Sequence, residues 1–256
     1  MVPLKVAGAS AVSVVVLGGG GYLVYDNLID IYIRTLDTTG YENNTFGKKY
    51  GRYLLDPNSS KNKGRWSKEY DSWQAYKTQS TNSLSSEFQD DNKVDKSYSN
   101  SQDQKALNRV CEVAFKALEI VVKGTDKTNY EDNVWMFCSL LDAKPVFINQ
   151  NETEYSSKLG QEATYNDKAM SARKPGANVS DANALFWDLR NKEFFELEWG
   201  SKATNGSVFK TLYDKRDNLK DRDNDNIRKA CEEAYKKVTS SPEKDDIRRF
   251  CYLIPE

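Results

Sequence analysis

Two ten-residue stretches decide the fold, LNRVCEVAFK at 107–116 and IRKACEEAYK at 227–236. In both stretches the apolar residues recur at helical spacing and a cysteine takes the fifth position. A second cysteine block follows each of them, FCSLL at 137–141 and FCYLI at 250–254. The sequence therefore indicates an internal duplication, which places the four cysteines in two equivalent pairs.

The duplication extends to a tryptophan far upstream of each cysteine helix. Trp66 lies 45 residues before Cys111, and Trp187 lies 44 residues before Cys231. Around the first tryptophan, a stripe of aromatic residues repeats at the spacing of one helix face, which is typical of a helix packed on a core. We therefore expect each copy to form a small helical bundle that begins with a tryptophan helix.

The expected organisation follows from the duplication and from the composition of the connecting segments. A chain of 256 residues accommodates two modules of about 100 residues each. We predict a mainly α protein with a membrane anchor and helical extension at 1–36, a tether at 37–52, helical module 1 at 53–145, a polar linker at 146–179 and helical module 2 at 180–256.

Composition excludes several functional classes. The chain has a mean hydropathy of −0.76 and a net charge of −1, with no basic stripe of the kind that nucleic-acid-binding proteins carry. It has no histidine, which removes the usual Ser–His and Cys–His nucleophile systems and the commonest zinc ligand. Its many aromatic residues argue against wholesale disorder.

The amino-terminal region predicts a membrane anchor. The 20 residues from Val6 to Tyr25 carry no charge, and this length suffices to span a bilayer as a helix. Lys5 precedes the stretch, and Asp26 and Asp30 follow it, so the positive-inside rule places the rest of the chain outside the cell. In a cleaved signal peptide the small residues would follow the apolar core, whereas here they precede it. We therefore expect an uncleaved single-pass anchor.

The cysteines are expected to form disulfides within each module, Cys111 with Cys138 and Cys231 with Cys251. Antiparallel neighbouring helices can bring such positions together, and bridges persist outside the cytosol. The closed loops span 27 and 20 residues, so each bridge contributes about 3 kcal/mol of stability in the chain-entropy model. The alternative is that the cysteines are reduced core residues. No CxxC spacing indicates a zinc or redox site.

One acidic stretch resembles a calcium loop. Asp221, Asp223, Asp225 and Glu232 stand at positions 1, 3, 5 and 12 of an EF-hand-like pattern. The sixth position holds Asn226 instead of glycine, and the duplication requires a helix from position 7 onward. Acidic residues that precede a helix are stabilised by its macrodipole, which explains them without a ligand. We predict no metal, no cofactor and no catalytic residue.

Two glutamate–lysine pairs recur in the cysteine helices, Glu112 with Lys116 and Glu232 with Lys236. Residues four apart lie on one helix face, so we expect ion pairs. Catalytic carboxylates would have to converge on a cleft, which the sequence does not indicate.

Short motifs along most of the chain resemble large paralogous families of uncharacterised proteins in haemotrophic mycoplasmas. They are the Ala/Gly-rich amino-terminal segment, Leu54-Leu-Asp56, Ser59-Ser-Lys61, Trp66-Ser-Lys68, Tyr76-Lys77, the Cys111 helix and Phe137-Cys138. The chain departs from the pattern at Phe137 and Phe250, where tryptophan is usual, and module 2 has no Leu-Leu-Asp. The resemblance implies a membrane-anchored surface protein involved in antigenic variation or host contact, without an established activity.

We therefore expect a non-catalytic, single-pass surface protein whose modules face the host, with the membrane and an unknown host factor as partners. One alternative is an adhesin or ligand-binding module that uses exposed tyrosine and tryptophan residues, and full burial of Trp66, Trp73, Trp135, Trp187 and Trp199 would argue against it. The other is a carboxylate-based hydrolase, which requires a pocket with convergent acids of raised pKa.

Overall fold

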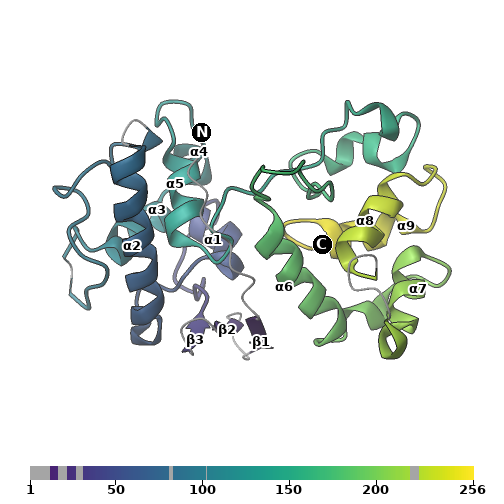
Figure 1. The fold of residues 1–256 in the computed structure, drawn as a ribbon, viewed down its shortest axis with the longest axis horizontal. Helices are drawn as coiled ribbons and strands as arrows, with labels where there is room; N and C mark the ends of the chain where they lie inside the picture. Colours follow the sequence, from purple (N-terminus) through teal and green to yellow (C-terminus); the bar gives the residue numbers. More distant parts are fainter. Residues whose placement is uncertain (1–11, 17–21, 27–30, 81–82, 102, 220–224) are drawn as a thin grey trace. The chain divides into compact units, whose positions relative to one another are not determined.

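The computed structural model describes residues 12–16, 22–26, 31–80, 83–101, 103–219 and 225–256 and is mainly helical (Figure 1). It divides into two compact units, Met1–Lys144 and Pro145–Glu256.

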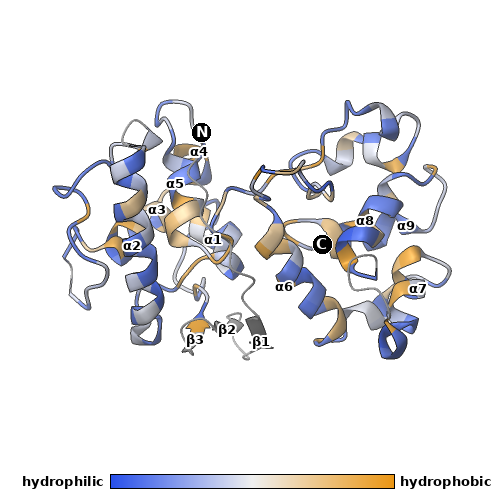
Figure 2. Ribbon diagram, in the orientation of Figure 1, coloured by the Kyte–Doolittle hydropathy of each residue, from blue (hydrophilic) through white to orange (hydrophobic). Residues whose placement is uncertain are grey.

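Unit 1 is built around a long helix and the first cysteine helix. Its helices are α1 (Phe46–Tyr50), α2 (Lys63–Gln79), α3 (Leu107–Lys116), α4 (Glu119–Val122) and α5 (Tyr130–Cys138). Helix α2 packs on α5; in Figure 2 its ribbon is mostly hydrophilic, whereas α5 is more apolar. Trp66 and Trp73 on the inner face of α2 are fully buried, as is Glu69, which forms an ion pair with the buried Arg65, and most of the other polar residues of the helix are at least partly exposed.

Unit 2 repeats this order with shorter helices. Its helices are α6 (Ala184–Phe195), α7 (Val208–Asp214), α8 (Ile227–Tyr235) and α9 (Glu243–Asp246). A single π-helical segment at Ile247–Cys251 continues α9 and carries the last cysteine. The cysteine helices α3 and α8 occupy the same place in the two units, since each contacts the tryptophan helix and the segment of the second cysteine.

The amino-terminal region differs from the expected helix. Its described parts form an antiparallel sheet of β1 (Val12–Val16), β2 (Tyr22–Asp26) and β3 (Ile31–Arg34), in the order β1-β2-β3. Valine and isoleucine dominate these segments, and β-branched residues favour an extended backbone over a helix. The expected membrane helix and its extension are therefore not found at these positions, and the remaining residues of 1–30 lie outside the described part.

Among the described residues, we find no helix that combines the length and the apolar character of a membrane span.

The expected tether at 37–52 is instead part of the core of unit 1. Thr45 caps α1 by accepting a hydrogen bond from the Lys48 N–H at 3.2 Å. The cap directs Phe46 and Tyr50 inward, where both are buried. Their rings lie 5.5 and 5.2 Å from the ring of Trp135 in edge-on contacts.

The expected linker at 146–179 likewise differs, since it belongs to unit 2. The segment is polar overall, but its apolar residues pack into the core of that unit. Six of them are buried: Ile148, Tyr155, Leu159, Tyr165, Ala169 and Met170. Its segment around Met170 pairs with Phe147 on one side, and Ala169 pairs with Tyr252 on the other.

Backbone hydrogen bonds join the second cysteine of unit 1 to an extended segment that follows α1. The Leu55 N–H donates to the Cys138 carbonyl at 3.0 Å, and the Leu140 N–H donates to the Tyr53 carbonyl at 2.8 Å. Unit 2 has the same pair of bonds. There the Met170 N–H donates to the Cys251 carbonyl at 2.9 Å, and the Leu253 N–H donates to the Lys168 carbonyl at 2.8 Å.

A buried asparagine ties this framework together in unit 1. The Asn62 Oδ1 accepts from the Arg34 N–H at 2.7 Å, while its Nδ2 donates to the carbonyls of Arg34 at 2.7 Å and Asp56 at 2.9 Å. Asn62 is fully buried and immediately precedes α2. One side chain therefore satisfies three backbone groups from two separate segments.

Asn183 does the same immediately before α6 of unit 2. Its Oδ1 accepts from the Val146 N–H at 2.9 Å, and its Nδ2 donates to the carbonyls of Val146 at 2.7 Å and Ser171 at 3.0 Å. One turn later, the Trp187 indole donates to the same Ser171 carbonyl at 3.1 Å. In unit 1 the Trp66 indole lies 3.4 Å from the equivalent carbonyl oxygen.

We expect Asn62→Ala to destabilise unit 1 and Asn183→Ala to destabilise unit 2, each by about 3 kcal/mol. The reason is that each substitution removes the acceptor of a backbone N–H and one donor from each of two carbonyls in the interior of the unit. Hydrogen–deuterium exchange measured by mass spectrometry would report the loss unit by unit. The exposed Asn43→Ala is the matched control, and equal loss of protection in both units for either core variant would contradict the expectation.

Candidate functional site

The four cysteines form the two bridges that the sequence predicts. Cys111 of α3 is bonded to Cys138 at the end of α5, with a Cα–Cα distance of 5.6 Å. Cys231 of α8 is bonded to Cys251, with a Cα–Cα distance of 5.9 Å. All four residues are fully buried. Because both bridges lie in the core and no thiol is free, the cysteines offer neither a nucleophile nor a metal ligand.

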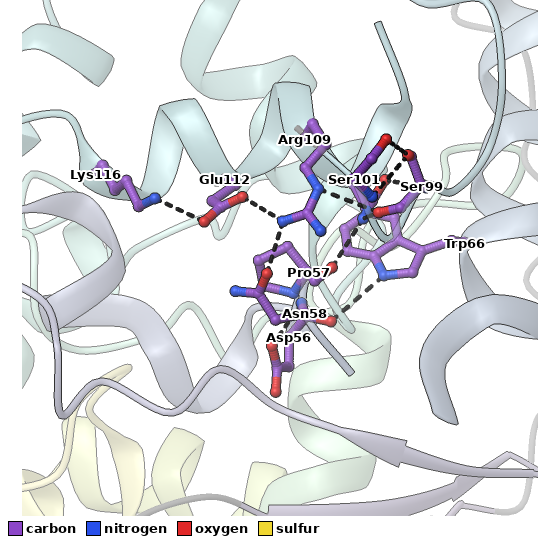
Figure 3. Close-up of polar contacts among 10 residues, drawn as sticks. Asp56, Pro57, Asn58, Trp66, Ser99, Ser101, Arg109, Glu112 and Lys116 are labelled. Carbon is purple, nitrogen blue, oxygen red and sulfur yellow. Dashed lines mark hydrogen bonds and ion pairs between the residues drawn. The ribbon is translucent and has the colours of Figure 1, made fainter. Parts of the chain in front are cut away.

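The most connected polar cluster of unit 1 surrounds Arg109 of α3 (Figure 3). Its Nη1 donates to Asn58 Oδ1 at 2.6 Å and to Glu112 Oε2 at 2.7 Å, and its Nε donates to the Ser99 carbonyl at 3.1 Å. Lys116 Nζ reaches the second oxygen of Glu112 at 2.6 Å. The cluster thereby fastens two loops to the side of the cysteine helix.

Asn108, the residue before Arg109, also holds these two loops against α3. Asn108 is fully buried, and its Nδ2 donates to the carbonyls of Pro57 at 2.8 Å and Ser99 at 3.0 Å. Its Oδ1 accepts from the Ser99 N–H at 3.0 Å. The polar atoms of Asn108 already form hydrogen bonds with backbone groups of the two loops. The cluster therefore stabilises the loops, and few of its polar atoms remain to bind a ligand.

Unit 2 keeps the glutamate of this cluster and changes its surroundings. Glu232 accepts from Lys229 at 2.9 Å and from Lys236 at 2.8 Å, so both expected glutamate–lysine pairs are present. Arg228 replaces Asn108 and donates to the Ala172 carbonyl at 2.7 Å; it also forms an ion pair with Asp181.

The electrostatics of the two glutamates are alike. Burial raises the pKa of the Glu112 carboxyl, but hydrogen bonds from Lys116 and Arg109 outweigh it and hold the pKa below its usual value. The pKa of Glu232 is lowered in the same way, because hydrogen bonds from Lys236 and Lys229 outweigh the effect of burial. Both carboxylates are ionised at neutral pH and fully engaged, which suits a structural ion pair better than proton transfer.

The calcium-loop pattern at 221–232 is only partly described, since Asp221 and Asp223 lie outside the described residues. Helix α8 begins at Ile227, and Asn226 caps it by accepting from the Lys229 N–H at 2.9 Å. The second half of the pattern is therefore helical, unlike a calcium loop. Within the described ranges no group of three or more acidic or cysteine residues is placed to hold a metal ion.

The tryptophans lie mainly in the cores. Trp66, Trp73, Trp135 and Trp187 are at most 4% exposed, and Trp199 is half-buried. The large exposed apolar side chains in the described part are aliphatic instead, and they include Val113, Leu118, Ile120 and Val121 of unit 1. Four of the five tryptophans are therefore core residues, and only Trp199 is partly accessible.

Unit 2 contains a cavity of about 330 Å³ between α7 and α8. Its lining is mixed in character, with apolar residues such as Val208 and Leu212 and charged residues of both signs. The charged residues of the lining are Lys215, Asp225, Lys229, Glu233, Lys237 and Glu243. Sequence reasoning missed this cavity because it forms only where α7 packs against α8 in the folded unit.

No family model, curated protein or solved structure matches this chain.

We expect replacement of either cysteine pair by serine to cost the unit that contains it about 3 kcal/mol of stability, because the unfolded chain regains the entropy of an open loop. Denaturant unfolding of the Cys111→Ser/Cys138→Ser and Cys231→Ser/Cys251→Ser variants would measure this loss. Non-reducing peptide mapping of the intact protein supplies the control, and fragments that join cysteines of different units would contradict the pairing.

Acidification should lower the stability of both units, because it protonates the ion-paired carboxylates of Glu112 and Glu232. Because the folded-state pKa of Glu112 and of Glu232 lies below the unfolded value, the unfolded chain binds more protons as pH falls, and stability present above a pH of about 4.3 is lost below it. We expect the double variant Glu112→Gln/Glu232→Gln to show a shallower loss of stability on acidification than the unmodified protein. Urea titrations between neutral and acidic pH measure the two slopes, and parallel slopes would contradict this account.

Proposed function

We propose that this chain is a non-catalytic surface protein that is attached through its amino-terminal apolar segment and displays its two units outside the cell. The role is contact with a host or evasion of it. The membrane and an unidentified host factor are its proposed partners.

One observation carries this proposal: the two units share a rigid frame but differ in the loops that the frame supports. The carbonyl that both the asparagine and the tryptophan approach belongs to Asp56 in unit 1 and to Ser171 in unit 2. The asparagine follows six positions later in unit 1, at Asn62, and twelve positions later in unit 2, at Asn183. A frame that tolerates such changes suits a displayed surface, because exposed loops can vary without loss of the fold.

A second loop differs more strongly. Between the tryptophan helix and the cysteine helix, unit 1 has no α-helix in its described residues, whereas unit 2 has α7. The frame nevertheless keeps its disulfide and its asparagine in both units. Variation is thus pronounced in the connections, whereas the disulfide and the asparagine before the tryptophan helix are kept in both units.

Chemistry and sequence support an extracellular location. Buried disulfides persist in oxidising surroundings and are rare in the cytosol. The stretch from Val6 to Tyr25 has the length and charge distribution of an anchor, and the resemblance to surface proteins of haemotrophic mycoplasmas points the same way.

The location can be tested on intact cells that produce the chain. We expect protease added outside to remove both units while a cytoplasmic marker protein survives, because the proposed topology exposes every residue after the anchor. An impermeant maleimide should label the cysteines only after denaturation and reduction, since all four are buried and bonded.

A matched control is the variant Lys5→Asp with Asp26→Lys and Asp30→Lys, which reverses the charges on either side of the apolar stretch. It should reverse or impair surface exposure under the positive-inside rule. Full protection of the unmodified chain in intact cells, together with its digestion after lysis, would refute the proposed topology.

A further inference from the structure

The chain has a single asparagine–glycine pair, Asn205-Gly206, and both residues are exposed in a turn of unit 2. The turn spans Thr204 to Ser207 and is closed by the Ser207 N–H, which donates to the Thr204 carbonyl at 3.0 Å. Gly206 has a φ of +83°, and the space that a Cβ would occupy there is open. Its own N–H forms no hydrogen bond with another described residue. The Asn205 side chain is therefore followed by an accessible peptide nitrogen that no side chain shields.

Such a pair can rearrange without an enzyme. The Gly206 nitrogen, once deprotonated, attacks the Asn205 Cγ; the new C–N bond closes a five-membered succinimide ring, and the side-chain nitrogen leaves as ammonia. Water then opens the ring at one of its two carbonyls. Cleavage of the bond to Cγ gives aspartate, whereas cleavage of the original peptide bond gives isoaspartate, the main product in peptides. The reaction is intramolecular, so it needs no reactant other than water.

The same turn holds a buried carboxylate. Asp246 of α9 is fully buried, and its Oδ2 accepts from the Thr204 N–H at 2.9 Å and from the Ser207 Oγ at 2.6 Å. Its Oδ1 accepts from the Thr204 Oγ1 at 3.1 Å and from the Arg249 Nη1 at 3.0 Å. Three of these donors belong to Thr204 and Ser207, the first and last residues of the turn. Their spacing depends on the length of backbone between them, which is the Asn205-Gly206 pair.

The two products differ in what they do to this turn. Aspartate at 205 keeps the backbone length and adds an exposed negative charge just before α7, where the helix macrodipole favours it. Isoaspartate routes the main chain through Cβ and Cγ and so adds one carbon between Thr204 and Gly206. The hydrogen bond that closes the turn and the spacing of the donors to Asp246 then no longer fit. A buried carboxylate that loses donors is strongly destabilising.

Unit 1 meets the same requirement without the susceptible pair. Asn133 lies five residues before Cys138, as Asp246 does before Cys251. Its Oδ1 accepts from the Ser85 N–H at 2.7 Å, and its Nδ2 donates to the Ser83 carbonyl at 3.3 Å. No asparagine–glycine pair occurs in that unit, and a neutral amide costs less than a carboxylate when a partner is lost. The combination of a reactive turn with a buried charge is therefore particular to unit 2.

We propose that Asn205 is a site of spontaneous deamidation and that its isoaspartate product releases the Thr204–Ser207 turn from Asp246. Ser207 also caps α7, because its Oγ accepts from the Lys210 N–H at 3.2 Å, so the release loosens α7 as well as α9. The Cys231–Cys251 bridge is not involved and stays closed. The modification is irreversible and accumulates with time, so aged molecules differ from new ones in unit 2 alone.

Peptide mapping of the oxidised full-length chain, aged in detergent at mildly alkaline pH, tests the site. We expect the tryptic peptide 203–210 to gain the mass difference between oxygen and NH, mainly as isoaspartate, and to react faster at alkaline than at acidic pH. Asn178 is the internal control, since it is exposed but the β-branched Val179 hinders attack, and it should stay intact. A synthetic 203–210 peptide shows that the conditions suffice. An Asn205 that stays intact in the protein after this peptide has reacted would overturn the proposal.

Hydrogen–deuterium exchange of the aged protein tests the consequence. In molecules with isoaspartate at 205, segments 204–214 and 243–251 should exchange about tenfold faster or more, while unit 1 is unchanged. Asn205→Gln, aged in parallel, should keep its protection because its longer side chain closes a ring far more slowly. Asn205→Asp has the charge without the extra carbon and should also keep it. Unchanged exchange in the isoaspartate form, or equal loss in either variant, would overturn the proposal. The result does not depend on where the chain resides, so it can fail while the surface role stands.

Discussion

In each unit, one amide side chain joins three backbone groups in the interior. The amide of Asn62 binds both the N–H and the carbonyl of Arg34 and also the carbonyl of Asp56. The two segments also bond to each other, since the Asp56 N–H donates to the Arg34 carbonyl at 3.0 Å and the Leu36 N–H donates to the Leu54 carbonyl at 2.9 Å, and the asparagine amide adds to these bonds. A buried backbone group without a partner costs stability. The asparagine removes that cost and fixes where the following helix begins, and the tryptophan one turn later is positioned over the same carbonyl.

The disulfide and the asparagine act on opposite sides of one extended segment. In unit 2, the Met170 N–H donates to the carbonyl of the bridged Cys251, while the neighbouring Ser171 carbonyl accepts from the Asn183 Nδ2. Covalent and polar constraints therefore converge on a few residues of backbone. This arrangement suits a small core, because a covalent link and a satisfied polar network each restrict the unfolded or misfolded alternatives.

Much of the cysteine framework could be predicted, because the signals were local or closely repeated. Helical spacing located the cysteine helices, the nearly equal offsets of Trp66 and Trp187 from the cysteines aligned the copies, and the four-residue spacing predicted the glutamate–lysine pairs. The asparagines were missed, although Asn62 and Asn183 each stand four residues before the repeated tryptophan. The same four-residue spacing between asparagine and tryptophan in both copies could have identified the two asparagines as part of the repeat.

Other features could not be read from local pattern. The 146–179 segment is polar overall, and its few buried aromatic and aliphatic residues follow no helical or strand period that would have distinguished it from a linker. The valine-rich start is ambiguous for a physical reason, since a short apolar run fits a strand as well as a helix. The cavity depends on contacts between α7 and α8 that only the tertiary fold brings about.

The pattern of divergence between the copies indicates where function is to be sought. Where a position holds backbone, the copies keep the chemistry or compensate for its change. Asn133 accepts from the Ser85 N–H in unit 1, and its counterpart Asp246, now a buried carboxylate, receives donors from Thr204 and Ser207. Positions that hold backbone are therefore kept or compensated in both copies, so a difference in function between the two units is to be sought in the loops that the frame supports and not in the frame itself.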